Sequence, residues 1–563
     1  MERSGRSLPV RTKKGDTRET RKTQHVQESN TACDHSKLCD PCETIERCLG
    51  DSLSQEDPNS LEFIENKGAI YSMGTVRNIR GRLCTECSRP RQCPLCRKLS
   101  EILGLESRDI SAHAYVSFRV DEGSRQRDHI NTWNADERTT RSFSQSTVAF
   151  RPRLYKYYVD SPLLQHKELF LTAVPPAHSS RESGTEPALI QLIQPDCIDI
   201  NFARHCLETC QNKHGEICQR VDPAVVQWKP QIYLLDLQDR CLVRSTVDTD
   251  YVALSYVWGQ QIETFECKME NLERFQEPGS IDDPEFFRIP ALIESAIEFT
   301  VKMGKRYLWI DRCCIVQDDG RHKHGQIMAM GIIYAQACFT IVSSDGDARS
   351  KLLSPGSFSG SAHSGREPNI FHQTRDCQIL YGLRYNSVPS DGPWASRGWT
   401  FQEQMFSRRL AIFVNGKLVW KCRTSIRQEE FRNELLIRNL NPNITFDTLT
   451  LPGWPDMQLF RRLVENYARR TLSYPCDSIS AFSGVLNSLE GSFFAGFLFG
   501  LPELYFDIAL LWQPYASLHD RKVLAELTGL PLQPLPTWSW CRWQGNINFE
   551  PWTAADECRV ISR

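Results

Sequence analysis

The chain has 563 residues, of which 40% are hydrophobic and 24% charged, and its formal net charge at pH 7 is −2. This composition is ordinary for a globular protein of roughly two to four domains. The near-neutral charge excludes a global electrostatic attraction to nucleic acid or to acidic membranes. The most apolar window, residues 493–501, is followed by Pro502 and Glu503 and is too short to span a bilayer.

The N-terminus lacks the apolar segment of a secretory signal, so we expect a cytoplasmic protein, with a nuclear location as the alternative. In such a compartment the 22 cysteines are expected to be reduced, and clustered cysteines then indicate metal binding before disulfides. Residues 1–32 are polar and rich in Arg and Lys, which predicts a disordered basic tail. A nuclear-import or nucleic-acid role of this tail is the less favoured alternative, because Asp16 and Glu19 dilute its charge.

Residues 33–104 form a cysteine-rich module. Two thiolates spaced C-x2-C can reach one tetrahedral ion through a tight turn, and two such pairs complete a closed structural zinc site. We therefore predict zinc ligands in three pairs: Cys39 and Cys42, Cys84 and Cys87, Cys93 and Cys96. Which pairs share an ion stays open, with Cys33, Cys48 and His35 as further candidates. The alternative is reduced cysteines packed in a small helical region. The module lacks C2H2 spacing, so we expect no DNA reading by it.

Residues 105–190 are a mixed region and linker, with strand-like pieces at 114–120 and 148–159. A helix is then expected over residues 201–213.

Cys210, His214 and Cys218 recur every four residues at the end of this helix. They could ligate zinc, because residues at i and i+4 share a helix face. We interpret them instead as packing residues.

A run of strands and helices follows, which we assign to a domain spanning residues 191–425. Residues 231–235 and 241–244 read as a hairpin. The unbroken apolar run that opens Tyr251–Gly259 predicts a strand buried on both faces, as in a parallel sheet.

Two further strand-and-helix units continue the pattern. Pro290 can begin a helix whose apolar stripe is Leu292, Ala296, Phe299 and Met303, and Gly304 ends it. A second strand at 307–310 ends at Asp311, and a helix over 326–336 leads to a third strand at 339–342.

Short connections between such units imply a parallel α/β sheet. Ligands bind outside the carboxyl ends of the strands in sheets of this kind. We therefore expect a binding crevice where five polar or aromatic residues follow the strands: Ser255, Trp258, Asp311, Ser343 and Ser344.

Four features follow this sheet along the chain. Residues 345–392 are rich in Ser, Gly and Pro and are expected to form a long loop or lid. Thr400-x-x-Glu403 fits a capping box, which is the structural interpretation of Glu403. A hairpin over 410–422 is turned at Asn415-Gly416, and residues 426–563 are expected to be an α+β extension that packs on the preceding domain.

The order of these motifs resembles the fungal heterokaryon-incompatibility (HET) domain. The blocks that carry the resemblance are YVALSYVWG, PALIESAIEF, RYLWIDRCCIVQDD, MGIIYAQACFTIVSSDGDA, WASRGWTFQEQMFSRRLAIF and LVWKC. The resemblance covers roughly residues 200–425 and implies an effector of non-self recognition that triggers programmed cell death. It also implies self-association and an unknown sensor or allelic partner, with no membrane and no nucleic acid among the partners.

HET domains are remotely similar to TIR domains, which have a flavodoxin-like parallel sheet flanked by helices. Some TIR domains cleave NAD+ with a glutamate that follows a Trp. The segment from Ser396 to Glu403 resembles that region, with one extra residue between Ser and Trp. The resemblance implies that Glu403 is catalytic and that NAD+ is the substrate. It implies six substrate-binding residues: Ser255, Tyr256, Trp258, Asp311, Arg397 and Trp399. A non-catalytic assembly module is the alternative. No GxGxxG or Walker loop is present, which argues against dehydrogenases and NTPases.

Overall fold

The computed structural model describes the parts of the chain that carry the fold. These are residues 114–120, 147–154, 167–174, 190–193, 198–219, 221, 229–259, 265–352, 367–373, 378–385, 387–389, 392–432, 435–436, 454–521 and 535–549. The predicted basic tail and the six predicted zinc ligands of the cysteine-rich module lie outside the described residues.

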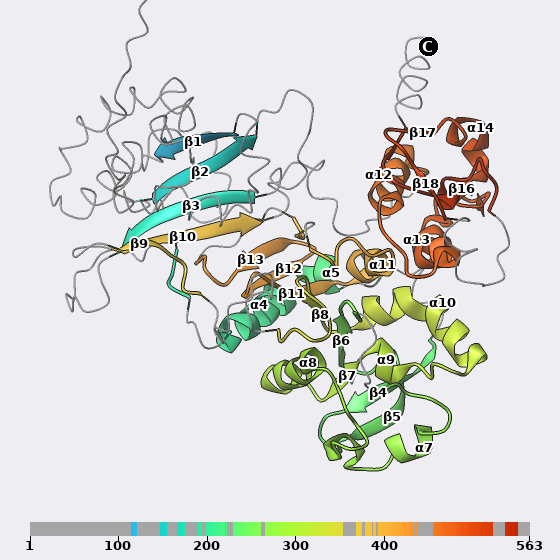
Figure 1. The fold of residues 1–563 in the computed structure, drawn as a ribbon, viewed down its shortest axis with the longest axis horizontal. Coiled ribbons are helices and arrows are strands. Elements are labelled where there is room, and N and C mark those ends of the chain that lie inside the picture. Colours follow the sequence, from blue (N-terminus) through green and yellow to red (C-terminus); the bar gives the residue numbers. More distant parts are fainter. Residues whose placement is uncertain are drawn as a thin grey trace, which may run out of the picture.

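The fold is mixed α/β, and its centre is a nine-stranded sheet within the described residues (Figure 1). In spatial order the strands are β14 (Leu435–Leu436), β13 (Ser425–Gln428), β12 (Lys417–Cys422), β11 (Arg409–Val414), β8 (Thr340–Ser343), β6 (Tyr251–Ser255), β7 (Tyr307–Trp309), β4 (Gln231–Asp236) and β5 (Cys241–Thr246). The four middle strands, β11, β8, β6 and β7, are mutually parallel.

The predicted parallel sheet is therefore confirmed for its centre, while both edges are antiparallel. β4 pairs antiparallel with β7 and β5, and β12 pairs antiparallel with β11 and β13. Short hairpin connections explain the β4–β5, β11–β12 and β12–β13 pairs, because two strands joined by a tight turn can only run antiparallel. At the β11–β12 turn, Asn415 (φ 49°) and Gly416 (φ 69°) both adopt the left-handed conformation that a two-residue hairpin requires.

Helices cover both faces of the central sheet. On one face lie α4 (Ile200–Lys213), α5 (Gly215–Gln219) and α8 (Ala291–Lys302); on the other lie α10 (Gly320–Gln336) and α11 (Trp399–Phe406). Phe299 of α8 packs edge-on against Phe413 of β11, with ring centroids 5.1 Å apart. On the opposite face the Tyr251 hydroxyl donates a hydrogen bond to the Ile333 carbonyl of α10.

The helix boundaries follow from local sequence chemistry. Asp199, Asp319 and Asp456 are the N-caps of α4, α10 and α12 (Met457–Ala468), and each side chain accepts a hydrogen bond from a first-turn amide. An Asp at this position satisfies an amide that has no partner inside the helix. Pro290 stands at the N-cap of α8 as expected, and Gly304 follows its end with φ +72°.

A second sheet contains five antiparallel strands. In spatial order they are β1 (Ala114–Val120), β2 (Thr147–Leu154), β3 (Lys167–Val174), β10 (Gln378–Tyr385) and β9 (Ile370–Gln373). The expectation of a long loop over residues 345–392 is wrong, because β9 and β10 fall inside it. The strand was not predicted because the surrounding segment is rich in Ser and Gly, which obscured the alternating apolar positions of β10. Gly382 of this strand lies under the Phe431 ring, where an added Cβ would come within 2.5 Å.

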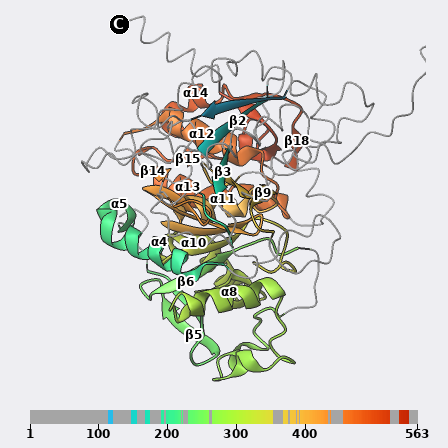
Figure 2. The ribbon, with the colours of Figure 1, turned by 90° about the vertical axis from the view of Figure 1, so that its left-hand side faces the viewer.

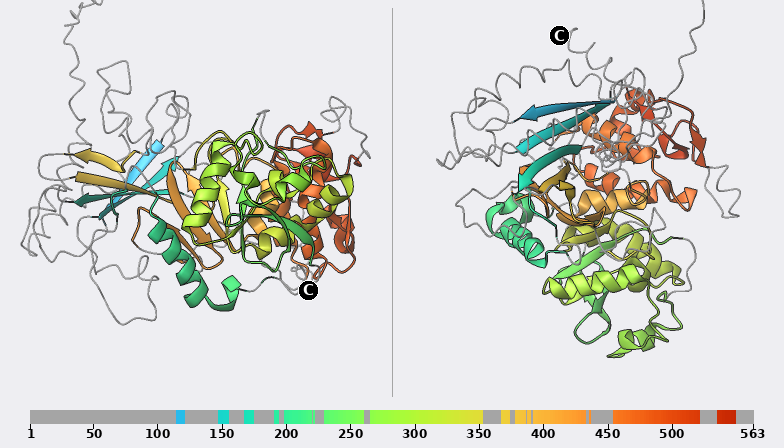
Figure 3. Two further views of the ribbon diagram at one scale, coloured as in Figure 1. Left: turned by 90° about the horizontal axis from the view of Figure 1, so that it is seen from below. Right: turned by 60° about the vertical axis from the view of Figure 1, so that its left-hand side comes forward.

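The C-terminal part is built from short elements around α12 and α13 (Ser480–Leu489). The others are η7 (Pro475–Ser478), β15 (Phe497–Leu498), β16 (Leu501–Pro502), η8 (Glu503–Tyr505), α14 (Phe506–Ala509), β17 (Gln513–Pro514), β18 (His519–Asp520), η9 (Trp540–Arg542), β19 (Trp543–Gln544) and β20 (Ile547–Asn548). Trp540 is 1% exposed and packs edge-on against Tyr467 and Phe482. Figures 2 and 3 show these elements at the end of the molecule opposite β5 and α7 (Leu272–Phe275) and on the side opposite the five-stranded sheet. Within the described residues, no helix has both the length and the apolarity to cross a bilayer.

Candidate functional site

The candidate site lies where β6 and β7 end and α11 crosses above them. Ser255 is the last residue of β6, and Asp311 follows the end of β7 as the first residue of the short helix α9 (Asp311–Cys314). The α11 residues from Thr400 to Phe406 are all buried. Ser255 and Asp311 both follow parallel strands at the carboxyl edge of the sheet, where the sequence placed them.

A buried hydrogen-bond chain joins three segments at this point. The Ser255 hydroxyl donates to Glu403 Oε2, and the Trp394 indole N–H donates to Ser255 Oγ at 2.6 Å. Ser255 and Glu403 are 148 residues apart in the chain and are 1% and 6% exposed. We call Ser255, Asp311, Trp394 and Glu403 the acid cluster.

The Glu403 carboxyl group has an elevated pKa, raised from 4.5 to about 7. Burial is the main cause, because it removes water from the charged form, and the negative charge of Asp311 adds to it. The hydrogen bond from Ser255 and the positive charge of Arg397 oppose the rise. At neutral pH the group is therefore present in both protonation states, as a general acid or base requires.

Asp311 is held by an aromatic donor. The Trp258 indole N–H donates to Asp311 Oδ2 at 2.7 Å, and the Arg312 guanidinium lies over the Trp258 ring, 4.5 Å from its centroid. Burial raises the pKa of Asp311, while the Trp258 hydrogen bond, the Arg312 amide and the charge of Arg397 oppose the rise. Two carboxyl groups with raised pKa values thus lie at this edge of the sheet, and the charge of Asp311 contributes to the raised pKa of Glu403.

Tyr256 and Arg397 complete the surroundings. Tyr256 is 4% exposed, and its hydroxyl has no hydrogen-bond partner among the described residues. Burial raises the pKa of Tyr256, and the charges of Asp311 and Arg397 also act on it. Native structures leave few buried polar atoms unpaired, so such a hydroxyl marks a place where a bound molecule can supply the missing partner.

Trp399 lies apart from this chain of contacts. Its indole N–H donates to Asp477 Oδ2 of η7 at 3.2 Å, at the junction with the C-terminal part. The structure thus forms two hydrogen-bonded pairs, Ser255 with Glu403 and Trp258 with Asp311, and the charge of Asp311 acts on Glu403. The polar end of Trp399 turns toward η7.

The capping-box interpretation of Glu403 is wrong. The N-cap of α11 is Gly398, and Thr400 lies inside the helix, where its hydroxyl donates to the carbonyls of Trp394 and Arg397. The Glu403 side chain is consequently free of a capping role and turns to the sheet.

Two contacting residues were missed from the sequence. Trp394 lay within the WASRGW block, but nothing in the sequence paired its indole N–H with Ser255. Tyr334 was predicted only as part of the apolar face of a helix, and hydrogen bonding by its side chain lowers the pKa of Glu403.

α11 is anchored from the C-terminal side. The Gln402 amide donates to the Ser480 carbonyl at 3.1 Å and accepts from the Gly484 amide at 2.9 Å, both on α13. Arg470 is buried and donates to Gln404 and to the Arg397 carbonyl. The helix that carries Glu403 is therefore positioned by residues that follow it by 66 to 82 positions.

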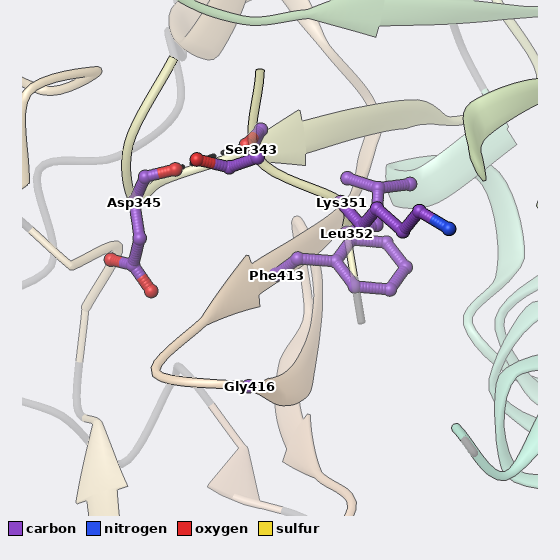
Figure 4. Close-up of a pocket in the computed structure, with 7 residues that line it drawn as sticks. Ser343, Asp345, Lys351, Leu352, Phe413 and Gly416 are labelled. Carbon is purple, nitrogen blue, oxygen red and sulfur yellow. Dashed lines mark hydrogen bonds between the residues drawn. The ribbon is translucent and has the colours of Figure 1, made fainter. Parts of the chain in front are cut away.

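A hollow on the opposite face of the sheet is separate from this site. Figure 4 shows Ser343 and Asp345 at the end of β8, beside Phe413, Lys351 and Leu352. It encloses about 280 Å³, counting the part open to solvent. Phe413 points to the α8 face and is paired with Ser343 in the sheet, so Ser343 lies on the side away from the acid cluster.

A second polar cluster joins α4, α5 and β12. Cys210, His214, Cys218 and Cys422 each present one sulfur or ring nitrogen, and these atoms all lie within 4.8 Å of one another. We call these four residues the thiol cluster. The sequence pointed to the first three residues, interpreted as packing residues, and missed Cys422, which ends the second strand of a hairpin 208 residues beyond His214.

One family model matches part of the chain. Residues 251–403 match the family model described as heterokaryon incompatibility protein (HET). The heterokaryon incompatibility protein 6, OR allele, of Neurospora crassa is 31% identical over 102 residues, which are 16% of this chain and 14% of that relative. No solved structure matches the chain.

Proposed function

We propose that this chain, whose residues 251–403 match the HET family model and which is similar over 102 residues to a heterokaryon incompatibility protein, is an effector of fungal non-self recognition, or vegetative incompatibility, that triggers programmed cell death. The matched segment runs from the start of β6 to Glu403 and therefore contains both ends of the hydrogen-bond chain between Ser255 and Glu403. The family description and the name of the relative both support incompatibility as the setting in which the site acts.

The activity that we propose is TIR-like hydrolysis of NAD+ at the acid cluster. The single observation that carries it is the buried Glu403 carboxyl group, with a pKa of about 7, near a second, partly buried acid at the carboxyl edge of parallel strands. The spatial order of the parallel strands, numbered along the chain, is 2-1-3-4. A flavodoxin-like sheet begins with this order, and it places a ligand at the switch between strands 1 and 3, which are β6 and β8.

The chemistry fits the charges of the site. Breaking the bond between ribose C1′ and the nicotinamide nitrogen leaves the electron pair on nicotinamide, which departs neutral, and creates an oxocarbenium-like ribose. A carboxylate beside C1′ stabilises that positive charge. Water then forms the new C1′–O bond, and Glu403 accepts its proton. The cationic nicotinamide ring of the substrate would lower the pKa of Glu403, so binding would favour the ionised form that the reaction needs.

The remaining site residues have defined parts in this proposal. Ser255 holds the Glu403 carboxylate in one orientation, Asp311 adds negative charge, and Trp258 holds Asp311. The unpaired Tyr256 hydroxyl and the Arg397 guanidinium are the groups that we assign to ribose and phosphate oxygens. Trp399 remains a predicted contributor to the nicotinamide pocket, although its N–H binds Asp477.

A non-catalytic assembly module is the second candidate, and one observation favours it. Glu403 is 6% exposed and already bound by Ser255, so a substrate reaches its carboxylate only if the surrounding segments open. Self-association through the HET domain could supply that opening in the first proposal, or could be the entire signal in the second. In both, an unknown sensor or allelic partner starts the process.

One experiment separates the two. NAD+ would be followed in cells that express the full chain and with the purified protein, for the wild type, Glu403→Gln and the control Glu298→Gln, an exposed α8 residue paired with Lys302. Hydrolysis predicts loss of NAD+ and cell death in the wild type and control, with both absent in Glu403→Gln. If the wild type kills cells while their NAD+ concentration stays constant, the hydrolysis proposal is wrong and the assembly module is the remaining candidate.

The cysteine-rich module of residues 33–104 remains a proposed zinc domain. Two C-x2-C pairs per ion is the chemical basis, with Cys39, Cys42, Cys84, Cys87, Cys93 and Cys96 as ligands. Metal analysis of a fragment of residues 30–100 tests it, and a folded fragment without metal would end the zinc proposal.

A further inference from the structure

We propose that the thiol cluster is a structural zinc site with the ligand set Cys210, His214, Cys218 and Cys422. Three cysteines and one histidine are a common closed set for this ion, which binds sulfur at about 2.3 Å and imidazole nitrogen at about 2.0–2.1 Å in a tetrahedron. Those bond lengths place neighbouring ligand atoms about 3.5–3.8 Å apart. His214 Nδ1 lies 3.3 Å from Cys422 Sγ and 3.9 Å from Cys218 Sγ, and all four ligand atoms lie within 4.8 Å.

The surroundings of the sulfurs are those of thiolates. Each sulfur has a hydrogen-bonding neighbour: Arg409 Nε lies 3.0 Å from Cys210, Thr424 Oγ1 lies 3.2 Å from Cys218, and the Ser425 amide lies 3.4 Å from Cys422. Outer contacts of this kind orient metal ligands and stabilise their charge. Arg409 is 2% exposed, and its positive charge balances the net −1 of three thiolates and one Zn²⁺.

Packing alone does not explain the cluster. Cys206, Cys267, Cys313, Cys314, Cys338 and Cys541 lie in the main hydrophobic core among aliphatic and aromatic side chains. Cys210, Cys218 and Cys422 instead form a buried group of their own, separate from that core and 0–1% exposed. A disulfide would use two of the three sulfurs and strand the third beside the imidazole, whereas one zinc ion uses all four groups.

The ligands come from separate elements, so the ion would have a structural role. Cys210 lies on α4, Cys218 on α5, and Cys422 at the end of β12. The ion would fasten the two helices to the hairpin that follows α11. Arg409 reinforces this junction, since it also donates to the carbonyls of Cys218 and Cys338.

Metal counting on the full chain tests the proposal. Zinc per chain would be measured for the protein purified under reducing conditions, and then for Cys422→Ala, His214→Ala and the control Cys206→Ala, which lies one turn before Cys210 on α4. We expect Cys422→Ala and His214→Ala each to lose about one zinc ion relative to wild type, and Cys206→Ala to lose none. Any zinc bound by residues 33–104 is present in every variant, so it cancels when the zinc contents per chain are compared.

A further variant, His214→Cys, tests the zinc site if Cys422→Ala fails to fold. His214 is only partly buried, and His214→Cys is expected to retain the ion as a four-cysteine site. With Co²⁺ in place of zinc, this variant should show stronger thiolate-to-cobalt absorption than wild type. Equal zinc content in wild type, His214→Ala and Cys422→Ala would overturn the proposal, as would a Cys210–Cys422 or Cys218–Cys422 disulfide in the reduced preparation.

Discussion

The acid cluster and the thiol cluster lie on opposite faces of the same sheet and differ in how their polar groups are satisfied. In the thiol cluster every sulfur has a hydrogen-bonding neighbour, and Arg409 supplies a matching charge. In the acid cluster two carboxyl groups keep raised pKa values, and the nearby Tyr256 hydroxyl lacks a partner among the described residues. The proposed zinc ion would give the thiol cluster a structural role, whereas the raised pKa values make the acid cluster the candidate for a reaction.

The largest effect is expected from Glu403→Gln, which keeps the shape of the side chain and removes its charge. If the acid cluster is a reaction site, the rate of NAD+ hydrolysis falls at least about 100-fold. The measurement is NAD+ turnover by purified protein, with circular dichroism to show that the variant is folded. An unchanged rate would show that the reaction takes place elsewhere. The acid cluster would then be a structural cluster like the thiol cluster.

The second prediction concerns stability and pH. The pKa of Glu403 is about 7 in the folded chain, against 4.5 as its ordinary value. Its contribution to stability is fully present below pH 4.5 and is lost as pH rises through 7, because the folded state must then ionise a buried acid. The full loss is about 3 kcal/mol.

Glu403→Gln lacks this titration. We therefore expect the free energy of unfolding of wild type, measured with denaturant, to fall relative to that of Glu403→Gln between pH 5 and pH 8. The fall should be most of the full loss of about 3 kcal/mol. A parallel pH dependence of the two proteins would show that Glu403 titrates normally, and the acid cluster would then be as well satisfied as the thiol cluster.

A smaller effect is expected from Gly484→Ala, which tests how α13 supports the acid cluster from outside. An added Cβ would lie 2.1 Å from Gln402 Oε1 and 3.1 Å from the Phe406 ring. We expect a destabilisation of about 1–3 kcal/mol. The matched control is Gly325→Ala in α10, where the Cβ meets nothing within 4 Å and greater helix propensity should stabilise slightly. Thermal unfolding that ranks the two variants equally would argue against this support.

The smallest effect is expected from Trp394→Phe. The change removes the donor to Ser255 but leaves the hydroxyl bound to Glu403, at a cost of about 1 kcal/mol. Trp454→Phe is the control, because Trp454 is 78% exposed. Equal unfolding midpoints for the two variants would mean that the indole N–H adds nothing to the acid cluster.

Sequence patterns predicted what is local in this fold. The β6, β7 and β8 strands, the caps of α8 and the Asn415-Gly416 turn were all visible because short-range spacing and backbone chemistry determine them. The antiparallel edges and the β9–β10 pair were not, because pairing between distant strands leaves no mark on either strand alone. The same limit explains the two clusters.

Ser255 and Asp311 were expected to meet because the carboxyl ends of parallel strands share one edge. Trp394 and Cys422 were not connected to any site, because each meets its partners only through the way distant segments pack. Glu403 was found through the family resemblance, and its local Thr400-x-x-Glu403 pattern pointed to a helix cap instead.

The anchoring of α11 has a consequence for how the protein is made. The matched family segment ends at Glu403, yet Phe401 on the same helix packs against Tyr467 and Phe482, and Gln402 is bound by α13. On the ribosome, Ser255 emerges long before these residues. We therefore expect the acid cluster to assemble only after the C-terminal part has been translated, so that an unfinished chain would lack the proposed site.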